Sequence, residues 1–138
     1  MFRKIDDSIS VAPQISVEQV QAAADQGFTM VINNRPDQEE PGQPSGEDIR
    51  EAARAAGLAY VAIPISHGGF SANQVDAMRD ALANAGGPVL AFCRSGTRST
   101  YVWALAKGAD GADPDTLVGK AAQAGYDISS IKPLLGPR

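Results

Sequence analysis

Val89-Leu-Ala-Phe-Cys93-Arg-Ser-Gly-Thr-Arg-Ser99 is the stretch of the sequence that decides the fold. Its first four residues are an apolar run typical of a buried strand, and a helical pattern of apolar residues follows Ser99. A short polar loop that contains a glycine joins the two. The stretch therefore predicts a strand, an anion-binding turn and a helix, with Cys93, the only cysteine of the chain, where the strand emerges.

The loop after Cys93 has the groups that hold an anion. Successive backbone N–H groups at the start of a helix would converge on one point, a geometry that binds a tetrahedral anion or stabilises a thiolate. The guanidinium of Arg98 would add a bidentate contact to two anion oxygens, which lysine cannot reproduce. The predicted anion-binding residues are Arg94, Ser95, Gly96 and Thr97. Nearby arginines and a helix N-terminus favour the thiolate over the thiol, so we predict that Cys93 is a nucleophile.

Three of these residues have a plainer alternative. A free cysteine is commonly a small buried apolar residue, although the arginines, serines and glycine around Cys93 favour the nucleophile. Arg94 would serve equally well as a solvent-facing loop residue. Ser99 is either a helix-start residue or a hydroxyl that hydrogen-bonds the sulfur and helps it leave, and both roles are compatible.

Composition limits the classes of protein to which the chain can belong. Its 138 residues, 43% of them hydrophobic, predict one domain over residues 1–138. A net charge of −4 does not give the basic surface that binding to nucleic acid or an anionic membrane needs, and no apolar run reaches the length of a membrane span. A single cysteine and the lack of a signal-peptide pattern predict the cytoplasm. One histidine and one cysteine make no metal-ligand cluster, so we expect neither metal nor cofactor.

Strand and helix patterns alternate along the chain. The expected strands are Phe28–Asn33, Tyr60–Ile65 and Val89–Phe92, after a short strand or edge hairpin between Phe2 and Val11. The expected helices are one between Ser16 and Gly27, one from Gly46 to about Ala56, one opened by Ser71, one after Ser99 that contains a partly buried Trp103, one from Asp113-Pro114 to Gly125, and a short one capped by Ser129 before Pro133. This alternation predicts a three-layer α/β/α fold with a mostly parallel central sheet.

The loop Asn33–Pro44 follows a predicted strand, and ligands bind at the carboxyl ends of strands in open α/β sheets. Asn34 and Arg35 stand next to the strand end, where they would shape a pocket or hold the turn through side-chain hydrogen bonds. The acidic residues further along would supply a proton donor or form the solvated tip of the loop. These carboxylates are Asp37, Glu39 and Glu40.

A second loop, Ser66–Phe70, follows the next predicted strand and contains His67, the only histidine. Imidazole is the side chain whose ordinary titration range lies closest to neutral pH, which makes His67 a candidate acid or base. The alternative is an exposed loop residue without a chemical role.

Taken together, these segments resemble the phosphatase-like domain of the beta-lactamase hydrolase-like proteins. The resemblance covers roughly residues 2–110 and is carried by Gly27–Asp37, Glu40–Ser45, Tyr60–Ile65 and Phe92–Ser99. That family is similar in fold to the dual-specificity and tyrosine phosphatases. The resemblance implies Cys93 as nucleophile, Arg98 as the clamp on the oxyanion, and Ser99 as the hydroxyl that assists departure of the thiolate.

Two departures from the phosphatase pattern stand out. Tyrosine phosphatases have five residues between the cysteine and the arginine, whereas four separate Cys93 from Arg98 here. The general-acid aspartate of the phosphatases would be expected after Ile65, but that loop begins Ser66-His67-Gly68-Gly69. Because general acid catalysis contributes roughly 10²- to 10⁴-fold, expulsion of a poor alkoxide leaving group would be slow.

The same Cys-Arg-Ser-Gly-Thr-Arg-Ser string resembles the active loop of rhodanese sulfurtransferases, whose cysteine carries sulfane sulfur as a persulfide. In relatives the phosphatase-like domain is joined to a metal-dependent persulfide-oxidising domain, which implies a separate persulfide-oxidising enzyme as a partner. The expected substrate is a small anion, either a phosphate ester or a sulfane sulfur donor. Three functions stay open: a cysteine-dependent hydrolase, a sulfurtransferase, and a non-catalytic module that binds an anion or a partner.

Overall fold

Five short strands form one sheet in the middle of the molecule. They are β1 (Arg3–Asp6), β2 (Ile9–Ala12), β3 (Met30–Asn33), β4 (Ala59–Ala62) and β5 (Val89–Phe92). In this computed structural model, which describes residues 2–137, their spatial order is β1-β2-β5-β3-β4. Only β1 runs antiparallel to its neighbour, so the prediction of a mostly parallel sheet is confirmed. The predicted edge hairpin is present, with β1 at the edge and β2 inside the sheet.

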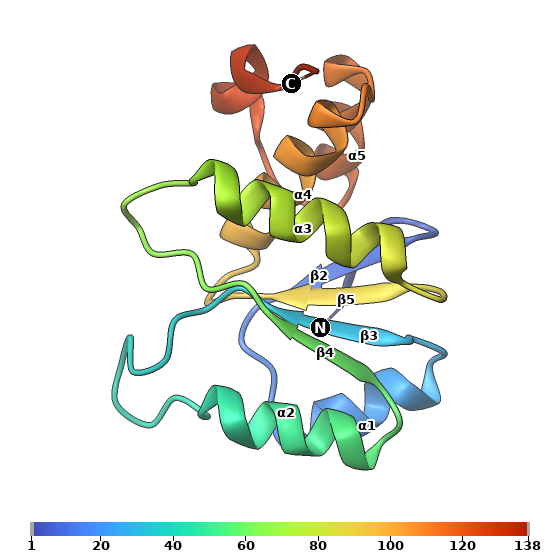
Figure 1. Ribbon diagram of the computed structural model, residues 1–138, viewed down its shortest axis with the longest axis vertical. Helices are drawn as coiled ribbons and strands as arrows, with labels where there is room; N and C mark the ends of the chain where they lie inside the picture. The colour runs from blue at the N-terminus through green and yellow to red at the C-terminus, as the bar shows by residue number, and fades with distance from the viewer. Residues whose placement is uncertain (1, 138) are drawn as a thin grey trace.

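Helices cover both faces of the sheet (Figure 1). The helices α1 (Val17–Asp25) and α2 (Gly46–Ala55) lie on one face, and α3 (Ala72–Asn84) and α4 (Thr97–Ala109) lie on the other. The helix α5 (Pro114–Gln123) and the 3₁₀ helix η1 (Ser129–Leu134) stack beyond α4, at the C-terminal end of the chain. The three-layer prediction is therefore confirmed, with a C-terminal helical segment added outside it.

The strand β5 shows why this stretch of sequence is apolar along its whole length. Leu90 and Phe92 pack into the core on the side of α1 and α2, whereas Val89 and Ala91 pack into the core on the side of α3 and α4. Successive side chains of a strand point to opposite faces, and here both faces are covered. All four residues are consequently buried, and the strand delivers Cys93 to its carboxyl end.

The strand predicted over Tyr60–Ile65 ends at Ala62, three residues early. Pro64 has no N–H with which to continue a ladder. The Ile63 N–H donates to the carbonyl of Asn33, the last residue of β3, at 2.9 Å. The Ile65 N–H donates to the carbonyl of Asn34, the next residue, also at 2.9 Å. The chain thus leaves β4 while still tied to the loop that follows β3.

Two predictions in the C-terminal half are wrong in detail. Ser129 is the first residue of η1 and not its cap, because the carboxylate of Asp127 accepts hydrogen bonds from both its N–H, at 2.9 Å, and its hydroxyl, at 2.6 Å. Trp103 is fully buried and not partly buried. It shares a core cluster with Leu117 and Ile128, which shows that the C-terminal segment covers α4.

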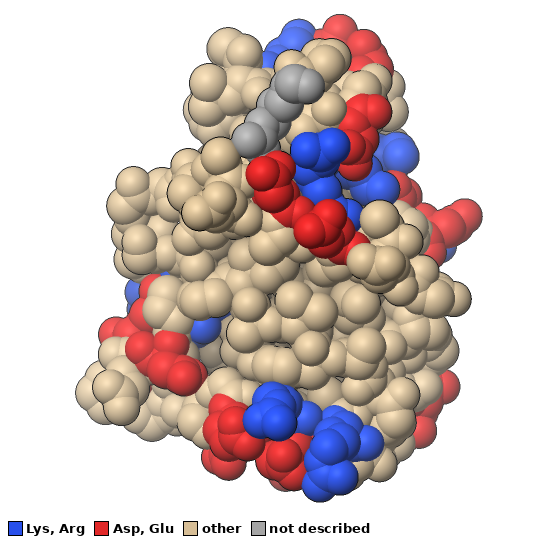
Figure 2. Space-filling model, in the orientation of Figure 1, with Lys and Arg blue, Asp and Glu red and all other residues tan. Residues whose placement is uncertain are grey.

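Charged side chains of both signs are interleaved on the surface shown in Figure 2. Along α2, for example, Arg50 pairs with Glu47 and Arg54 pairs with Glu51, each across one turn of the helix. No helix within residues 2–137 has the length and apolar character that crossing a bilayer requires.

Candidate active site

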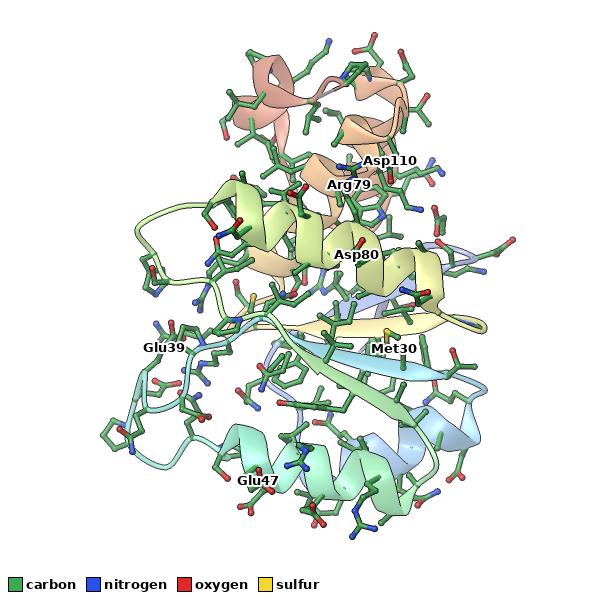
Figure 3. The ribbon with its side chains drawn as sticks, viewed as in Figure 1. Met30, Glu39, Glu47, Arg79, Asp80 and Asp110 are labelled. Carbon is green, nitrogen blue, oxygen red and sulfur yellow. The ribbon has the colours of Figure 1, made fainter. Side chains whose placement is uncertain are left out.

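The candidate site lies at the carboxyl edge of the sheet. Because β3, β4 and β5 run parallel, the loops that follow them emerge at the same edge. The loop between β3 and α2 and the loop between β4 and α3 both extend from that edge in Figure 1, and Cys93 directly follows β5. Figure 3 places Glu39, on the first of these loops, beside the end of the sheet.

Cys93 is fully buried, and its sulfur faces the start of α4. The N–H of Gly96 donates a hydrogen bond to the Cys93 Sγ at 3.1 Å. Gly96 is the N-cap of α4 with a φ of 97°, a left-handed conformation that glycine adopts without strain. As a glycine it offers no side chain to cap the helix, whereas Ser16, Ser45, Ser71 and Asp113 cap the other α-helices. The Gly96 N–H, at the N-terminus of α4, is thus directed at the Cys93 sulfur.

Arg94, Ser95 and Gly96 connect Cys93 to α4, whose first residue is Thr97. The hydroxyl of Ser95 donates to the Thr97 hydroxyl oxygen at 3.0 Å, and the Ser95 hydroxyl oxygen accepts from the Thr97 N–H at 3.3 Å. The side chain of Arg94 is 63% exposed, and its Nη2 lies 3.6 Å from a carboxylate oxygen of Glu40. Arg94 therefore stands at the rim of the site, where either an anion or solvent can reach it.

Arg98 is held against the site by a bidentate ion pair with Glu39. Its Nη1 donates to Glu39 Oε2 at 2.7 Å and its Nη2 to Glu39 Oε1 at 2.9 Å, while Nη1 also donates to the Ile65 carbonyl at 2.6 Å. These bonds use only Nη1 and Nη2. The hydrogen bond to Glu39 raises the pKa of Arg98 most, burial opposes it, and the charge of the nearby Cys93 sulfur raises it further.

Glu39 also forms an ion pair with Arg35, whose side chain is only 2% exposed. Arg35 donates to Glu39 from Nε at 2.8 Å, to Glu40 from Nη2 at 2.8 Å and to Gln14 from Nη1 at 3.0 Å. The hydrogen bond from Arg98 lowers the pKa of Glu39 to about 2, with Arg35 also lowering it and burial opposing. Glu39 is therefore a carboxylate at neutral pH, which suits a partner of two arginines and not a proton donor.

Asn34 joins the loop after β3 to the start of α4. Its Nδ2 donates to the Ile63 carbonyl at 3.1 Å, so its Oδ1 is the acceptor for the Ser99 hydroxyl at 2.8 Å. Both side chains are fully buried. A hydroxyl has one proton, so Ser99 can donate to the Cys93 sulfur only after turning away from Asn34. The role of Ser99 in thiolate departure stays a prediction.

The two remaining candidates belong to the loops that follow β3 and β4. The carboxylate of Asp37 accepts a hydrogen bond from the Gly46 N–H at 2.7 Å, which directs it to the start of α2 and not to the Cys93 loop. His67 is 75% exposed, with Nε2 3.8 Å from Glu39 Oε2, so it lies at the rim of the site. Within residues 2–137 no three His, Cys, Asp or Glu side chains are grouped closely enough to hold a metal.

Sequence reasoning missed Gln14 and Tyr126 and did not foresee the pairing of Glu39 with Arg98. The spacing of Glu39 and Glu40, four and five residues after Arg35, was an available signal for the ion pairs in this loop. No local pattern marked Tyr126, whose hydroxyl donates to the Ser95 carbonyl at 2.9 Å.

The fold and the loop at Cys93 define a phosphatase-like α/β domain. The family described as the phosphatase-like domain of the beta-lactamase hydrolase-like protein matches residues 1–110, and the chain belongs to that family. A beta-lactamase hydrolase-like protein of Agrobacterium fabrum is 37% identical over 108 residues, covering 78% of this chain and 25% of that protein. The chain thus spans about a quarter of the length of the curated relatives it matches.

Solved structures agree with this assignment. A putative phosphatase of Neisseria meningitidis superposes with a TM-score of 0.83 and 29% sequence identity, covering 96% of this chain and 94% of that one. A putative phosphatase of Shewanella putrefaciens gives a TM-score of 0.73 at 19% identity, covering 97% and 83% of the two chains. The second likeness shows the shared fold alone.

Proposed function

We propose that this domain is a cysteine-dependent phosphatase-like hydrolase of small phosphate esters, with Cys93 as its nucleophile. One observation carries the proposal: the Gly96 N–H lies 3.1 Å from the Cys93 Sγ. Arg98 follows in the first turn of α4, and Cys93 contributes to the raised pKa of its guanidinium. An N–H donor, a nearby guanidinium and a helix N-terminus all stabilise a thiolate and, later, the oxygens of a phosphoryl group.

In the proposed reaction the Cys93 thiolate attacks phosphorus, and the bond from phosphorus to the leaving oxygen breaks as that oxygen gains a proton. The loop N–H groups and Arg98 hold the three other phosphoryl oxygens. Water then attacks the phosphocysteine and the P–S bond breaks, which releases phosphate and restores the thiolate. Ser99 would hydrogen-bond the departing sulfur after turning from Asn34.

The site offers a limited choice of proton donors for the leaving oxygen. Glu39 is ionised, with a pKa of about 2, and the loop Ser66–Phe70 contains no carboxylate. His67, at the rim, is the donor that we propose. We therefore infer a preference for good leaving groups, such as aryl phosphates, over alkyl phosphates. Replacing His67→Ala would slow alkyl phosphate hydrolysis and leave aryl phosphate hydrolysis nearly unchanged.

The ionised state of Glu39 also favours a second candidate, a sulfurtransferase. Here the Cys93 thiolate attacks the sulfane sulfur of thiosulfate, the S–S bond breaks, and sulfite leaves as an anion that needs no proton. The resulting persulfide passes its outer sulfur to an acceptor thiolate or to cyanide. The loop with four residues between Cys93 and Arg98 matches the rhodanese spacing.

Parallel assays on one preparation separate the candidates. The hydrolase predicts turnover of an aryl phosphate that is lost in Cys93→Ser, with no lasting mass change after thiosulfate treatment. The sulfurtransferase predicts one added sulfur on Cys93 after thiosulfate and transfer of that sulfur to cyanide. If neither substrate reacts but inorganic phosphate still binds, the module is a non-catalytic anion binder. Aryl phosphatase activity that survives Cys93→Ser would exclude Cys93 as nucleophile.

A further inference from the structure

Two hydrogen bonds meet on the single peptide unit between Ser95 and Gly96. On one side, the Tyr126 hydroxyl donates to the Ser95 carbonyl at 2.9 Å. On the other side, the Gly96 N–H donates to the Cys93 Sγ at 3.1 Å. The tyrosine and the candidate nucleophile are thus linked through one amide, although they are far apart in the sequence.

The geometry of a peptide unit makes this link rigid. The unit is planar and trans, so its C=O and N–H point in opposite directions, and fixing one fixes the other. Gly96, with a φ of 97°, has no Cβ to restrict rotation of the unit on its own. A rotated unit would turn the Ser95 carbonyl dipole toward the sulfur and disfavour the thiolate. The hydrogen bond from Tyr126 also polarises the amide, which strengthens its N–H as a donor.

Tyr126 is itself fixed by contacts with the opposite end of the chain. The guanidinium carbon of Arg3, in β1, lies 5.5 Å from the centre of the Tyr126 ring. The Nη1 of Arg3 also donates to the Ala124 carbonyl at 3.3 Å. The ring lies so close to Gly96 that any Cβ at this position would collide with the tyrosine hydroxyl. Burial raises the pKa of Tyr126, Arg3 lowers it and the charge of Cys93 raises it, so the phenol remains a proton donor at neutral pH.

We propose that Tyr126 is a positioning residue that orients the Ser95–Gly96 amide toward Cys93 and so increases the fraction of Cys93 present as thiolate. This inference rests on the proposed function, because only a reactive Cys93 needs an oriented donor. It also extends the site beyond residues 1–110, which the family match covers, into the segment after α5.

The test is the titration of Cys93 in the variant Tyr126→Phe, which keeps the ring over Gly96 and removes only the hydroxyl. Cys93 is the only cysteine, so the ultraviolet absorbance of the thiolate reports on it alone below the pH at which tyrosines ionise. Arg98, Arg94 and Glu39 at the site, and Arg3 beside the Tyr126 ring, are identical in both proteins. The matched control is Tyr101→Phe. It removes a tyrosine hydroxyl that lies 3.5 Å from the Ser130 hydroxyl.

In Tyr126→Phe the ratio of thiolate to thiol at a given pH is expected to fall about threefold to tenfold, the effect of losing one hydrogen bond. Tyr101→Phe should leave the ratio unchanged, and a comparable melting temperature of the two variants would exclude a general loss of structure. A ratio in Tyr126→Phe equal to that of the wild type would overturn the role of Tyr126 alone. A wild-type Cys93 that titrates like a free thiol would instead contradict the proposed function.

Discussion

Glu39 binds both terminal nitrogens of Arg98, at 2.7 and 2.9 Å, across 59 positions of the sequence. The same carboxylate accepts a hydrogen bond from the buried Arg35. One side chain of the loop between β3 and α2 therefore joins that loop to α4 and fixes the guanidinium of Arg98. This relationship ties the stability of the fold to the geometry of the site.

Stability should depend on pH through Glu39. Its pKa is about 2 in the folded protein and near 4.5 when unperturbed, so the carboxylate stabilises the fold above that higher value, and this contribution is lost as pH falls toward 2. The wild type should have a higher free energy of unfolding than Glu39→Gln, and this difference should be about 2 kcal/mol smaller at about pH 3 than at neutral pH. Urea denaturation measures both, with the exposed Glu47→Gln as control. An advantage independent of pH would contradict the pairing.

Arg98→Lys should lose anion binding even though the charge is kept. Lysine presents one ammonium and cannot hold Glu39 through two nitrogens while bonding the Ile65 carbonyl. We expect hydrolysis of an aryl phosphate to fall by about 10²-fold or more, the effect of losing one transition-state donor. The matched control is Arg94→Lys at the exposed rim, where we expect a change of only a few-fold. Equal losses in the two variants would show that the fork of Arg98 has no special role.

Asn34→Asp should destabilise the fold despite its unchanged shape. It replaces the Nδ2 donor with an oxygen that faces the Ile63 carbonyl in a fully buried position. The expected cost is about 2–4 kcal/mol of unfolding free energy, since a buried acceptor loses its donor and a charge enters the core. Asn84→Asp, which removes an exposed donor to the Asp80 carbonyl, should cost less than about 0.5 kcal/mol. Chemical denaturation measures the unfolding free energy of both variants. Similar losses in the two would contradict the buried hydrogen bond from Asn34 to the Ile63 carbonyl.

Gly96→Ala and Gly27→Ala form a matched pair, because both glycines have a positive φ, of 97° and 95°. At Gly27 a Cβ would meet nothing within 4 Å, so the cost is backbone strain of about 1 kcal/mol. At Gly96 it would also displace Tyr126, and we expect loss of aryl phosphate hydrolysis. Melting temperatures and activity together check this, and an active Gly96→Ala would contradict the close contact.

Much of the fold could be predicted because its signals are local. Ser16 and Ser71 each stand three residues before a glutamine, and both capping boxes are present in the structure. The strand β5 and the glycine-containing loop after it could likewise be predicted from a few consecutive residues. The end of β4 was misjudged because Ile63 and Ile65 continue the apolar pattern, while Pro64 between them has no N–H and the Ile65 N–H binds Asn34, in the loop after β3.

The site was only partly predictable because its contacts join distant segments. The loop from Cys93 to Ser99 could be recognised from residue types alone. The pairing of Glu39 with Arg98 depends on which parallel strands are neighbours in the sheet, and the contact of Tyr126 with Ser95 depends on how the C-terminal segment packs on α4. The spacing of residues along the sequence predicts neither the order of the strands nor the packing of the C-terminal segment.

The central claim is that Cys93 forms a covalent bond with a phosphoryl group. Its most direct test is mass spectrometry of the protein denatured rapidly during turnover of an aryl phosphate. The predicted result is one phosphoryl group on the peptide that contains Cys93, absent when the substrate is withheld and absent in Cys93→Ser. Continued turnover by the wild type without any adduct on Cys93, or undiminished turnover by Cys93→Ser, would contradict the account.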